Sequence, residues 1–343
     1  PLLNYDGSNY GFHWLGQSFL YDYLTSLGPG KPIVDFEYHA FSINPIRVTD
    51  INPRHASATL WLAHLHGLVG NIAWYWQDRS GDDPFPDSWF ESWFHASIST
   101  QPLLAAEYFH TMGHLNRLSE EIVALAKDRD VPVRLLVSKP AYIHNQSHIN
   151  ALHRAYEGLC FQGKRVGFIT GDMLEQAGVS ERCETIVLAD AQFVSGATLD
   201  ALQQAGHQGV SLVRFGQRSP KFDAYGQAHP PEALAFLNGT PVISYGSAEQ
   251  AHHEFAKTLK PRRNSVTARI VGKDHAFGVL HRHTTLGDRS LLLLVNTLSK
   301  PVEVEIISAD GKTLAGRDLI TAEKIGPRSC RLAIQGVRLI EVQ

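Results

Sequence analysis

The sequence lacks any long uncharged apolar run, and it contains only three cysteines among 343 residues. The first absence excludes a membrane-spanning helix, which needs about 20 consecutive apolar residues. Cys160, Cys183 and Cys330 are widely spaced and form no CxxC pair, so neither a disulfide framework nor a zinc site is predicted. Free cysteines favour the cytoplasm over an oxidising compartment, and the compartment is otherwise left open.

Blocks of one charge and nucleotide-binding motifs are also absent. The net charge is −3 without clusters of one sign, whereas a nucleic-acid partner needs a basic face. The loop at 138–142 has neither a GxGxxG nor a GxxxxGK[ST] pattern, and the 18 histidines form no HExxH motif or Cys/His set. We therefore expect no cofactor, no bound metal, and neither a nucleic-acid nor a membrane partner.

One short apolar run ends in a carboxylate. Residues 31–39 (KPIVDFEYH) follow Gly-Pro-Gly punctuation, and their apolar and β-branched side chains predict a buried strand with Glu37 near its end. A helix is predicted next, which places the carboxylate at the carboxyl end of a parallel strand, where α/β barrels have their chemistry. The alternative is a Glu in a salt bridge at a strand end.

Tryptophan is clustered in the sequence. Five of the six tryptophans lie between positions 61 and 93. Flat rings stack on the apolar faces of pyranoses while polar neighbours bind the hydroxyls, so this clustering suits a sugar-binding site. A tryptophan-rich core is the alternative, and without Glu37 it would be preferred.

The first 130 residues predict helices and strands in alternation, typical of a parallel barrel or doubly wound sheet. The expected elements are a helix at 15–27, a strand at 31–38, a helix at 53–68, a strand at 71–77 and a long helix at 101–127. Two strands cannot close a barrel and would leave an unpaired edge and an apolar face in water. Because the chain also starts at Pro1 without an initiator Met, we expect residues 1–130 to be the C-terminal part of a (β/α)8 barrel that other polypeptide completes.

Residues 131–260 predict a second α/β segment. Four strands are expected at 133–138, 165–170, 185–189 and 211–215, with helices between them and a helix at 247–259. Parallel strands separated by helices predict a flavodoxin-like domain. A flavin or amidotransferase domain with Cys160 as nucleophile is an alternative, but Cys160 lies inside a predicted helix instead of at a strand-to-helix elbow.

Residues 261–343 have the pattern of an all-β domain. Strands are expected at 266–271, 277–283, 290–296, 302–307, 313–319 and 330–342. Their alternation of apolar and polar residues between turns predicts a small antiparallel β-sandwich. The expected fold class is therefore α/β, with a partial barrel, a flavodoxin-like domain and a β-sandwich in that order.

This order of domains resembles the second half of the glycoside hydrolase family 42 β-galactosidases, which belong to the large clan of (β/α)8 retaining glycosidases. In that clan the nucleophile is a Glu at the end of the seventh barrel strand, and a Trp often ends the eighth. Glu37 in VDFEYH matches the first feature, and Trp76 in AWYWQDRSG is similar to the second, with Trp74 as the other candidate. The resemblance also implies a trimerisation-type middle domain, and hence a homo-oligomer such as a trimer.

One departure from the family pattern concerns the general acid/base. In the clan it is a Glu, usually after Asn, at the end of the fourth strand, and no Asn-Glu pair occurs here. The resemblance therefore implies that an N-terminal segment of the same protein, or a partner chain, supplies it. Further contacts to a carbohydrate substrate are expected from His39, Tyr5, Tyr10 and Glu91, although Glu91 in a plain helix-cap role is the stronger alternative.

The resemblance implies a retaining, exo-acting β-glycosidase, most similar to a β-galactosidase, that removes terminal sugars from oligo- or polysaccharides. Its two carboxyl groups would act by double displacement. Asp35 is a second-tier candidate at the site, with a structural role in the strand as the preferred alternative. The competing hypothesis is a non-catalytic carbohydrate-binding or assembly protein built on the same domains.

Overall fold

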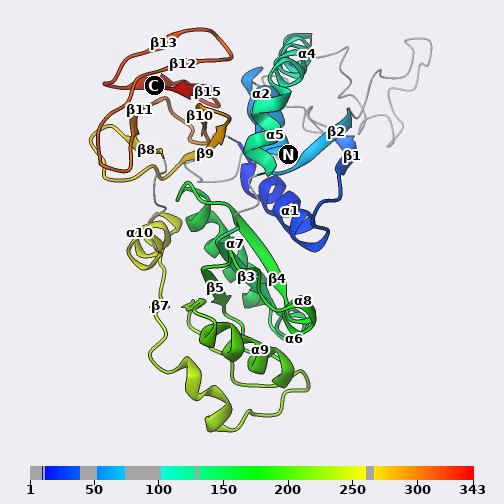
Figure 1. Cartoon of the computed structure of the whole chain (residues 1–343). Helices are drawn as coiled ribbons and strands as arrows, with labels where there is room; N and C mark the ends of the chain where they lie inside the picture. Colours follow the sequence, from blue (N-terminus) through cyan, green and yellow to red (C-terminus); the bar gives the residue numbers. More distant parts are fainter. Residues whose placement is uncertain (1–9, 11, 39–51, 74–101, 128–130, 260–265) are drawn as a thin grey trace, which may run out of the picture. The chain divides into compact units, whose positions relative to one another are not determined.

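The computed structural model describes residues 10, 12–38, 52–73, 102–127, 131–259 and 266–343 (Figure 1). The chain divides into two compact units. Unit 1 comprises residues 1–21, 30–127 and 264–343, and unit 2 comprises residues 22–29 and 128–263. The expected partial barrel and the expected β-sandwich therefore lie in the same unit.

The amino-terminal part of unit 1 contains two parallel strands and the helices around them. In chain order the elements are α1 (Trp14–Leu27, which enters unit 2 after Tyr21), β1 (Ile33–Tyr38), α2 (Arg54–Leu65), β2 (Leu68–Ala73), α4 (Pro102–Arg117) and α5 (Ser119–Lys127). β1 and β2 pair in parallel, as the predicted alternation of strand and helix requires. α2 lies between them in the chain, and nearly all of its side chains are buried.

Two boundaries in this part differ from the prediction. The second strand begins at Leu68 instead of residue 71, because α2 ends at Leu65 and Gly67 turns the chain with φ of 103°. That left-handed conformation is accessible to glycine at little cost. The predicted helix at 101–127 is two helices, although Leu118 still donates to the His114 carbonyl (2.9 Å) and accepts from Ile122 (3.0 Å). The apolar pattern of the sequence continues across the break between α4 and α5, so the pattern did not predict two helices.

The carboxyl-terminal part of unit 1 consists of antiparallel strands in two sheets. The strands are β8 (Thr267–Ile270), β9 (Val279–Leu286), β10 (Arg289–Asn296), β11 (Val302–Ile307), β12 (Gly316–Asp318), β13 (Lys324–Ile325), β14 (Cys330–Leu332) and β15 (Val337–Val342). The sheets have the orders β13-β12-β15-β10-β9 and β14-β11-β8. The single strand predicted at 330–342 is two strands, because a turn with Gln335 at φ of 56° separates β14 from β15.

Arginines of the antiparallel part bond to the helices of the same unit. The Nη1 of Arg282, a buried residue, donates to the carbonyl of Leu65 at the end of α2 (2.7 Å). A cation at this position also interacts favourably with the negative end of the helix dipole. Arg289 joins Glu121 of α5 (2.9 Å) to Glu341 of β15 (2.6 Å). These bonds make the two parts of unit 1 one folded body.

We expect Arg282→Met to lower the free energy of unfolding of unit 1 by about 1.5–3 kcal/mol, because a hydrogen bond from a charged donor to a buried carbonyl is lost. Chemical denaturation measures the change. Arg269→Met is the matched control, since Arg269 pairs with Glu305 at the surface (2.7 Å) and such pairs contribute about 0–1 kcal/mol. Equal losses for both variants would contradict the assignment.

Unit 2 is built around a five-stranded parallel sheet in the order β4-β3-β5-β6-β7. Its strands are β3 (Val133–Val137), β4 (Val166–Thr170), β5 (Thr185–Ala189), β6 (Ser211–Phe215) and β7 (Val242–Ile243). Its helices are α6 (Lys139–His144), α7 (Gln146–Cys160), α8 (Gly171–Ala177), α9 (Gly196–His207), the 3-10 helix η2 (Pro231–Leu237) and α10 (Ala248–Thr258). All four predicted strands are present, and only the two-residue β7 was missed.

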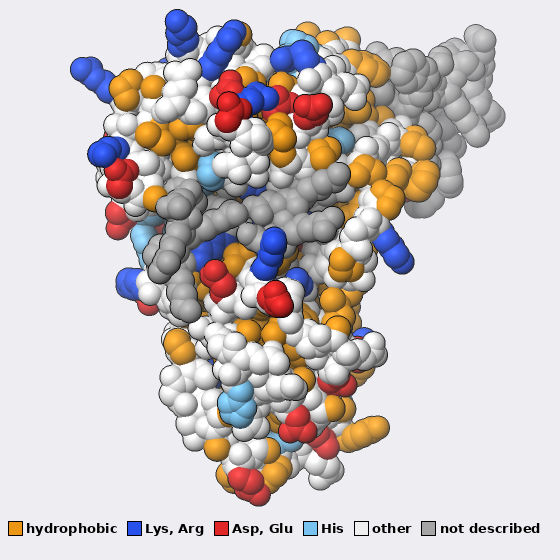
Figure 2. Space-filling model, viewed as in Figure 1, with side chains coloured by type: hydrophobic (Ala, Val, Ile, Leu, Met, Phe, Trp, Pro, Cys, Tyr) orange, Lys and Arg blue, Asp and Glu red, His pale blue; other side chains and the backbone are white. Residues whose placement is uncertain are grey.

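The described residues thus form a mixed α/β protein with parallel and antiparallel sheets. Basic and acidic side chains are intermixed over the visible face (Figure 2). None of the described helices has both the length and the apolar character needed to cross a bilayer.

Candidate functional site

Glu37 is the penultimate residue of β1, at the carboxyl end of a strand that pairs in parallel with β2. Its side chain is exposed, and its backbone N–H donates to the Oδ1 of Asp35 (3.0 Å). The next residue, Tyr38, is buried. The strand therefore ends with one anchored aromatic ring and one carboxylate that is accessible to a ligand.

Asp35 bonds to two elements around this strand end. Its Oδ2 accepts from the hydroxyl of Tyr21 on α1 (2.7 Å), and its Oδ1 accepts from the backbone of Glu37 (3.0 Å). Burial and the bond to Asp35 raise the pKa of Tyr21, so its hydroxyl stays protonated and remains a donor. Asp35 holds α1 and the end of β1 in place, which is a positioning role.

A polar and aromatic cluster lies behind the strand ends. The hydroxyl of Tyr108 on α4 donates to the Oδ1 of Asn71 on β2, and the amide nitrogen of Asn71 contacts the sulfur of Met112 (3.9 Å). The rings of Tyr38 and Tyr108 lie 6.5 Å apart. Burial raises the pKa of both tyrosines, which keeps them neutral. Asn71 and Tyr108 were missed from the sequence, where an Asn at the start of a predicted apolar strand was the only signal.

Several apolar side chains of β1 and β2 are exposed, which corrects the prediction that residues 31–38 form a buried strand. The exposed fractions are 42% for Val34, 68% for Phe36, 61% for Val69 and 54% for Ile72. Among the described strands, β1 pairs only with β2, so each strand has an open edge. Parallel strands are normally covered on both faces. Among the described residues, the sheet of β1 and β2 therefore has apolar side chains that no other strand covers.

Of the other predicted site residues, the structure describes only Tyr10. His39, Trp74, Trp76, Tyr5 and Glu91 lie outside the described residues. Tyr10 is described, and its ring packs edge-on against Trp14 (5.6 Å) and lies 6.5 Å from Phe277 beside the core of the antiparallel part. Trp61, one of the clustered tryptophans, is fully buried on α2, so for this residue the core alternative holds.

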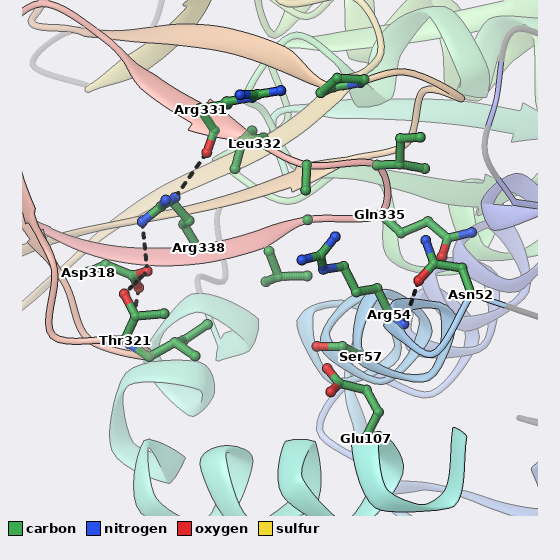
Figure 3. A pocket seen from close by; sticks show the side chains of 16 residues that line it. Asn52, Arg54, Ser57, Glu107, Asp318, Thr321, Arg331, Leu332, Gln335 and Arg338 are labelled. Carbon is green, nitrogen blue, oxygen red and sulfur yellow. Dashed lines mark hydrogen bonds and ion pairs between the residues drawn. The ribbon is translucent and has the colours of Figure 1, made fainter. Parts of the chain in front are cut away.

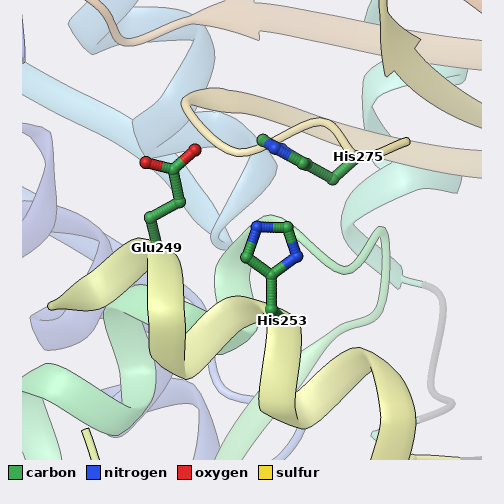
Figure 4. A group of neighbouring side chains, drawn as sticks. All are labelled: Glu249, His253 and His275. Atoms are coloured by element: carbon green, nitrogen blue, oxygen red, sulfur yellow. The ribbon is translucent and has the colours of Figure 1, made fainter. Parts of the chain in front are cut away.

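Glu249 and His253 lie one turn apart on α10 (Figure 4). Residues four apart on a helix share a face, so both side chains project on the same side of α10. His275, also drawn in Figure 4, belongs to unit 1, and the two residues of α10 by themselves are fewer than the three or four protein ligands of zinc sites. We therefore assign no metal to this pair.

Comparisons with known proteins give a match in structure but not in sequence. No family model and no curated protein matches the chain. The apo exo-carrageenase of glycoside hydrolase family 42 from Bacteroides ovatus superposes with a TM-score of 0.79 at 22% identity, over 98% of this chain and 45% of that chain. A catalytic mutant of a family 42 β-galactosidase from G. stearothermophilus gives 0.67 at 12% identity, over 96% and 57%.

A third match is the β-galactosidase from Bacillus circulans sp. alkalophilus, with a TM-score of 0.66 at 12% identity over 99% of this chain and 59% of that chain. The chain thus spans about half the length of these glycoside hydrolases. At these identities the similarity concerns the fold. The expected resemblance is confirmed at that level: the chain has the fold of the C-terminal half of the family 42 β-galactosidases.

Proposed function

We propose that this chain is the C-terminal part of a retaining, exo-acting β-glycosidase, most similar to a β-galactosidase, that hydrolyses terminal sugars of oligo- or polysaccharides. The observation that carries the proposal is the accessible carboxylate of Glu37 at the carboxyl end of a parallel strand, in a chain with the fold of family 42 enzymes. In (β/α)8 enzymes the chemistry lies at that end of the strands. The exo-carrageenase and the β-galactosidases among the similar structures support an enzyme that acts on glycosidic bonds.

In this mechanism Glu37 is the nucleophile. Its ionised carboxylate attacks the anomeric carbon and forms a covalent glycosyl-enzyme, which water then hydrolyses. A second carboxyl group about 5–5.5 Å away first protonates the leaving oxygen and afterwards activates the water. An N-terminal segment of the same protein or a partner chain supplies this acid/base. The bond from the Glu37 backbone to Asp35 fixes the direction in which the nucleophile leaves the strand.

Substrate contacts are proposed for the aromatic and polar residues around the strand ends. Trp76, with Trp74 as the second candidate, stacks on the apolar face of the sugar. His39, Tyr5, Tyr10 and Glu91 are the proposed contacts to its hydroxyl groups. The middle segment is proposed to hold the protein as a homo-oligomer such as a trimer.

A barrel completed by further polypeptide is supported by the exposed apolar side chains of β1 and β2. We expect Phe36→Asp to cost about 3 kcal/mol or more in the complete protein, because a charge would be buried without a partner. In the chain alone the same substitution should change stability by under about 0.5 kcal/mol, since Phe36 is exposed there. Chemical denaturation of both proteins measures the difference. Equal effects in the two backgrounds would contradict a completed barrel.

The activity is tested by assaying the complete protein with a nitrophenyl β-galactoside. Hydrolysis is expected, and proton NMR of the released sugar should show the β-anomer first, because double displacement retains configuration. Release of the α-anomer would overturn the retaining mechanism. Binding of galactosides without hydrolysis would favour the alternative, a non-catalytic carbohydrate-binding or assembly protein.

A further inference from the structure

A pocket of about 570 Å³ lies within unit 1, between the helices α2 and α4 and the strands β14 and β15 (Figure 3). Ligand pockets typically measure about 300–1,000 Å³. The helices contribute Arg54, Ser57 and Glu107, and the antiparallel part contributes Arg331, Gln335 and Arg338. The pocket contains neither Glu37 nor any other residue of the proposed catalytic site.

One wall of the pocket is held by an ionic network. The Nη1 of Arg338 pairs with Asp318 (3.1 Å) and with Glu323 (2.7 Å). Asp318, whose side chain is fully buried, also accepts from the hydroxyl of Thr321 (2.8 Å) and from the backbone of Ile320 (3.0 Å). These bonds fix the segment 318–321 that lines the pocket, and they neutralise Arg338. The pocket is therefore built before any ligand enters it.

Two further guanidinium groups remain available. Arg54 and Arg331 are exposed and form no ion pair with any residue that the structure describes. The side chain of Arg54 rises from α2 toward the strands of the sandwich (Figure 3). The first amides of α2 are occupied, because Asn52 accepts from Arg54 N (3.1 Å) and His55 N (2.8 Å). The cationic donors available in the pocket are thus these two arginine side chains, which match planar anions.

The remaining lining residues offer contacts that an inorganic anion alone would not use. Glu107 contributes an acceptor, while Ser57 and Gln335 add polar groups. An acceptor in a pocket that two arginines also line suits a ligand with hydroxyl donors as well as a negative charge. Leu332, Ile334 and Val337 add apolar surface that can pack on the carbon face of a ring.

We propose that this pocket binds an anionic saccharide unit, a pyranose that carries a sulfate or a carboxylate group. Arg54 and Arg331 bind the anionic group, and Glu107, Ser57 and Gln335 bind the hydroxyls. Arg54 begins α2, so it lies at the same end of the strand–helix unit as Glu37 but in the outer layer of helices. The pocket is a second glycan site, which retains an acidic polysaccharide while its end is processed elsewhere.

Calorimetric titration of the complete protein tests the proposal, with Glu37→Gln as the background so that no substrate is turned over. The probes are galactose 6-sulfate, galacturonic acid, galactose and inorganic sulfate. Binding of an acidic sugar is expected to weaken about tenfold in Arg54→Ala and again in Arg331→Ala, because each removes charge-assisted hydrogen bonds. It should also weaken as NaCl is raised.

Arg317→Ala is the matched control, because Arg317 is an exposed arginine of β12 that does not line the pocket. Its affinity should equal that of the background protein. Unchanged affinity in the double variant Arg54→Ala/Arg331→Ala, with a native circular dichroism spectrum, would overturn the proposal. So would equal affinity for galactose, which removes the role of charge, or for inorganic sulfate, which removes the role of the sugar. Because binding is measured without turnover, failure here is distinct from failure of the glycosidase mechanism.

Discussion

Glu37→Gln is expected to abolish hydrolysis of a nitrophenyl β-galactoside by the complete protein, with a loss on the order of a thousandfold or more. An amide cannot attack the anomeric carbon, so the glycosyl-enzyme does not form. The fold should be retained, because Glu37 is exposed in the chain and surface substitutions change stability by about 0.5 kcal/mol or less. Steady-state kinetics and thermal unfolding of the variant measure the two effects.

Two variants make this experiment specific. Glu120→Gln applies the same chemical change to an exposed carboxylate on α5, and it should retain full activity. Glu37→Ala with added azide tests the role directly, since azide entering from the vacated side would give an α-glycosyl azide. Activity of Glu37→Gln near the unsubstituted level would refute the assignment of the nucleophile.

The stability of unit 1 is expected to fall steeply as the pH drops from 6.5 towards 4. Burial lowers the pKa of His55 to about 3 and that of His281 to about 4. Above pH 6.5 both rings are neutral in the folded and unfolded states and have no effect. Below it the unfolded chain binds protons that the folded chain excludes, at about 1.4 kcal/mol per pH unit for each histidine. At pH 4.5 the two histidines together lower the free energy of unfolding by about 5 kcal/mol.

Burial of both rings explains the exclusion of the proton. His55 packs edge-on against Phe12 (5.9 Å). The Nδ1 of His281 lies 3.2 Å from the carbonyl of Val279, and this contact raises the pKa of His281 by less than burial lowers it. Denaturant unfolding at several pH values measures the slope. His281→Gln should remove about half of the pH dependence of the unfolding free energy that His55 and His281 produce together. His207→Gln, at the exposed end of α9, should leave that dependence unchanged. A flat profile between pH 6.5 and 4.5 would contradict the burial argument.

The parallel strands of unit 2 were predictable because runs rich in apolar residues, such as 133–137 and 185–189, are short and bounded by helical patterns. The break at Leu118 and the short strands β7 and β13 were not predictable. Segments of two or three residues are too short to show a periodic pattern. Strand 31–38 was placed correctly, but its exposure was not predicted, since burial depends on neighbouring strands and not on the strand itself.

The candidate site was predictable only where chemistry and local pattern coincide. Glu37 stands out because a carboxylate ends an apolar strand. The bonds from Tyr21 to Asp35 and from Tyr108 to Asn71 join segments 14 and 37 residues apart, and no local pattern marks them. The pocket residues come from positions 52 to 338, so only the folded chain brings Arg54 and Arg331 to one place.

The order of the two units along the chain has a consequence for biosynthesis. Arg282 bonds to Leu65 across 217 residues, so α2 emerges from the ribosome long before the strands that cover it. At about 5–20 residues per second this interval is roughly 10–40 s. Unit 2, which lies almost entirely between these two segments, is fully translated first. A nascent chain therefore contains all of unit 2 before the strands that bond to the end of α2 have been made.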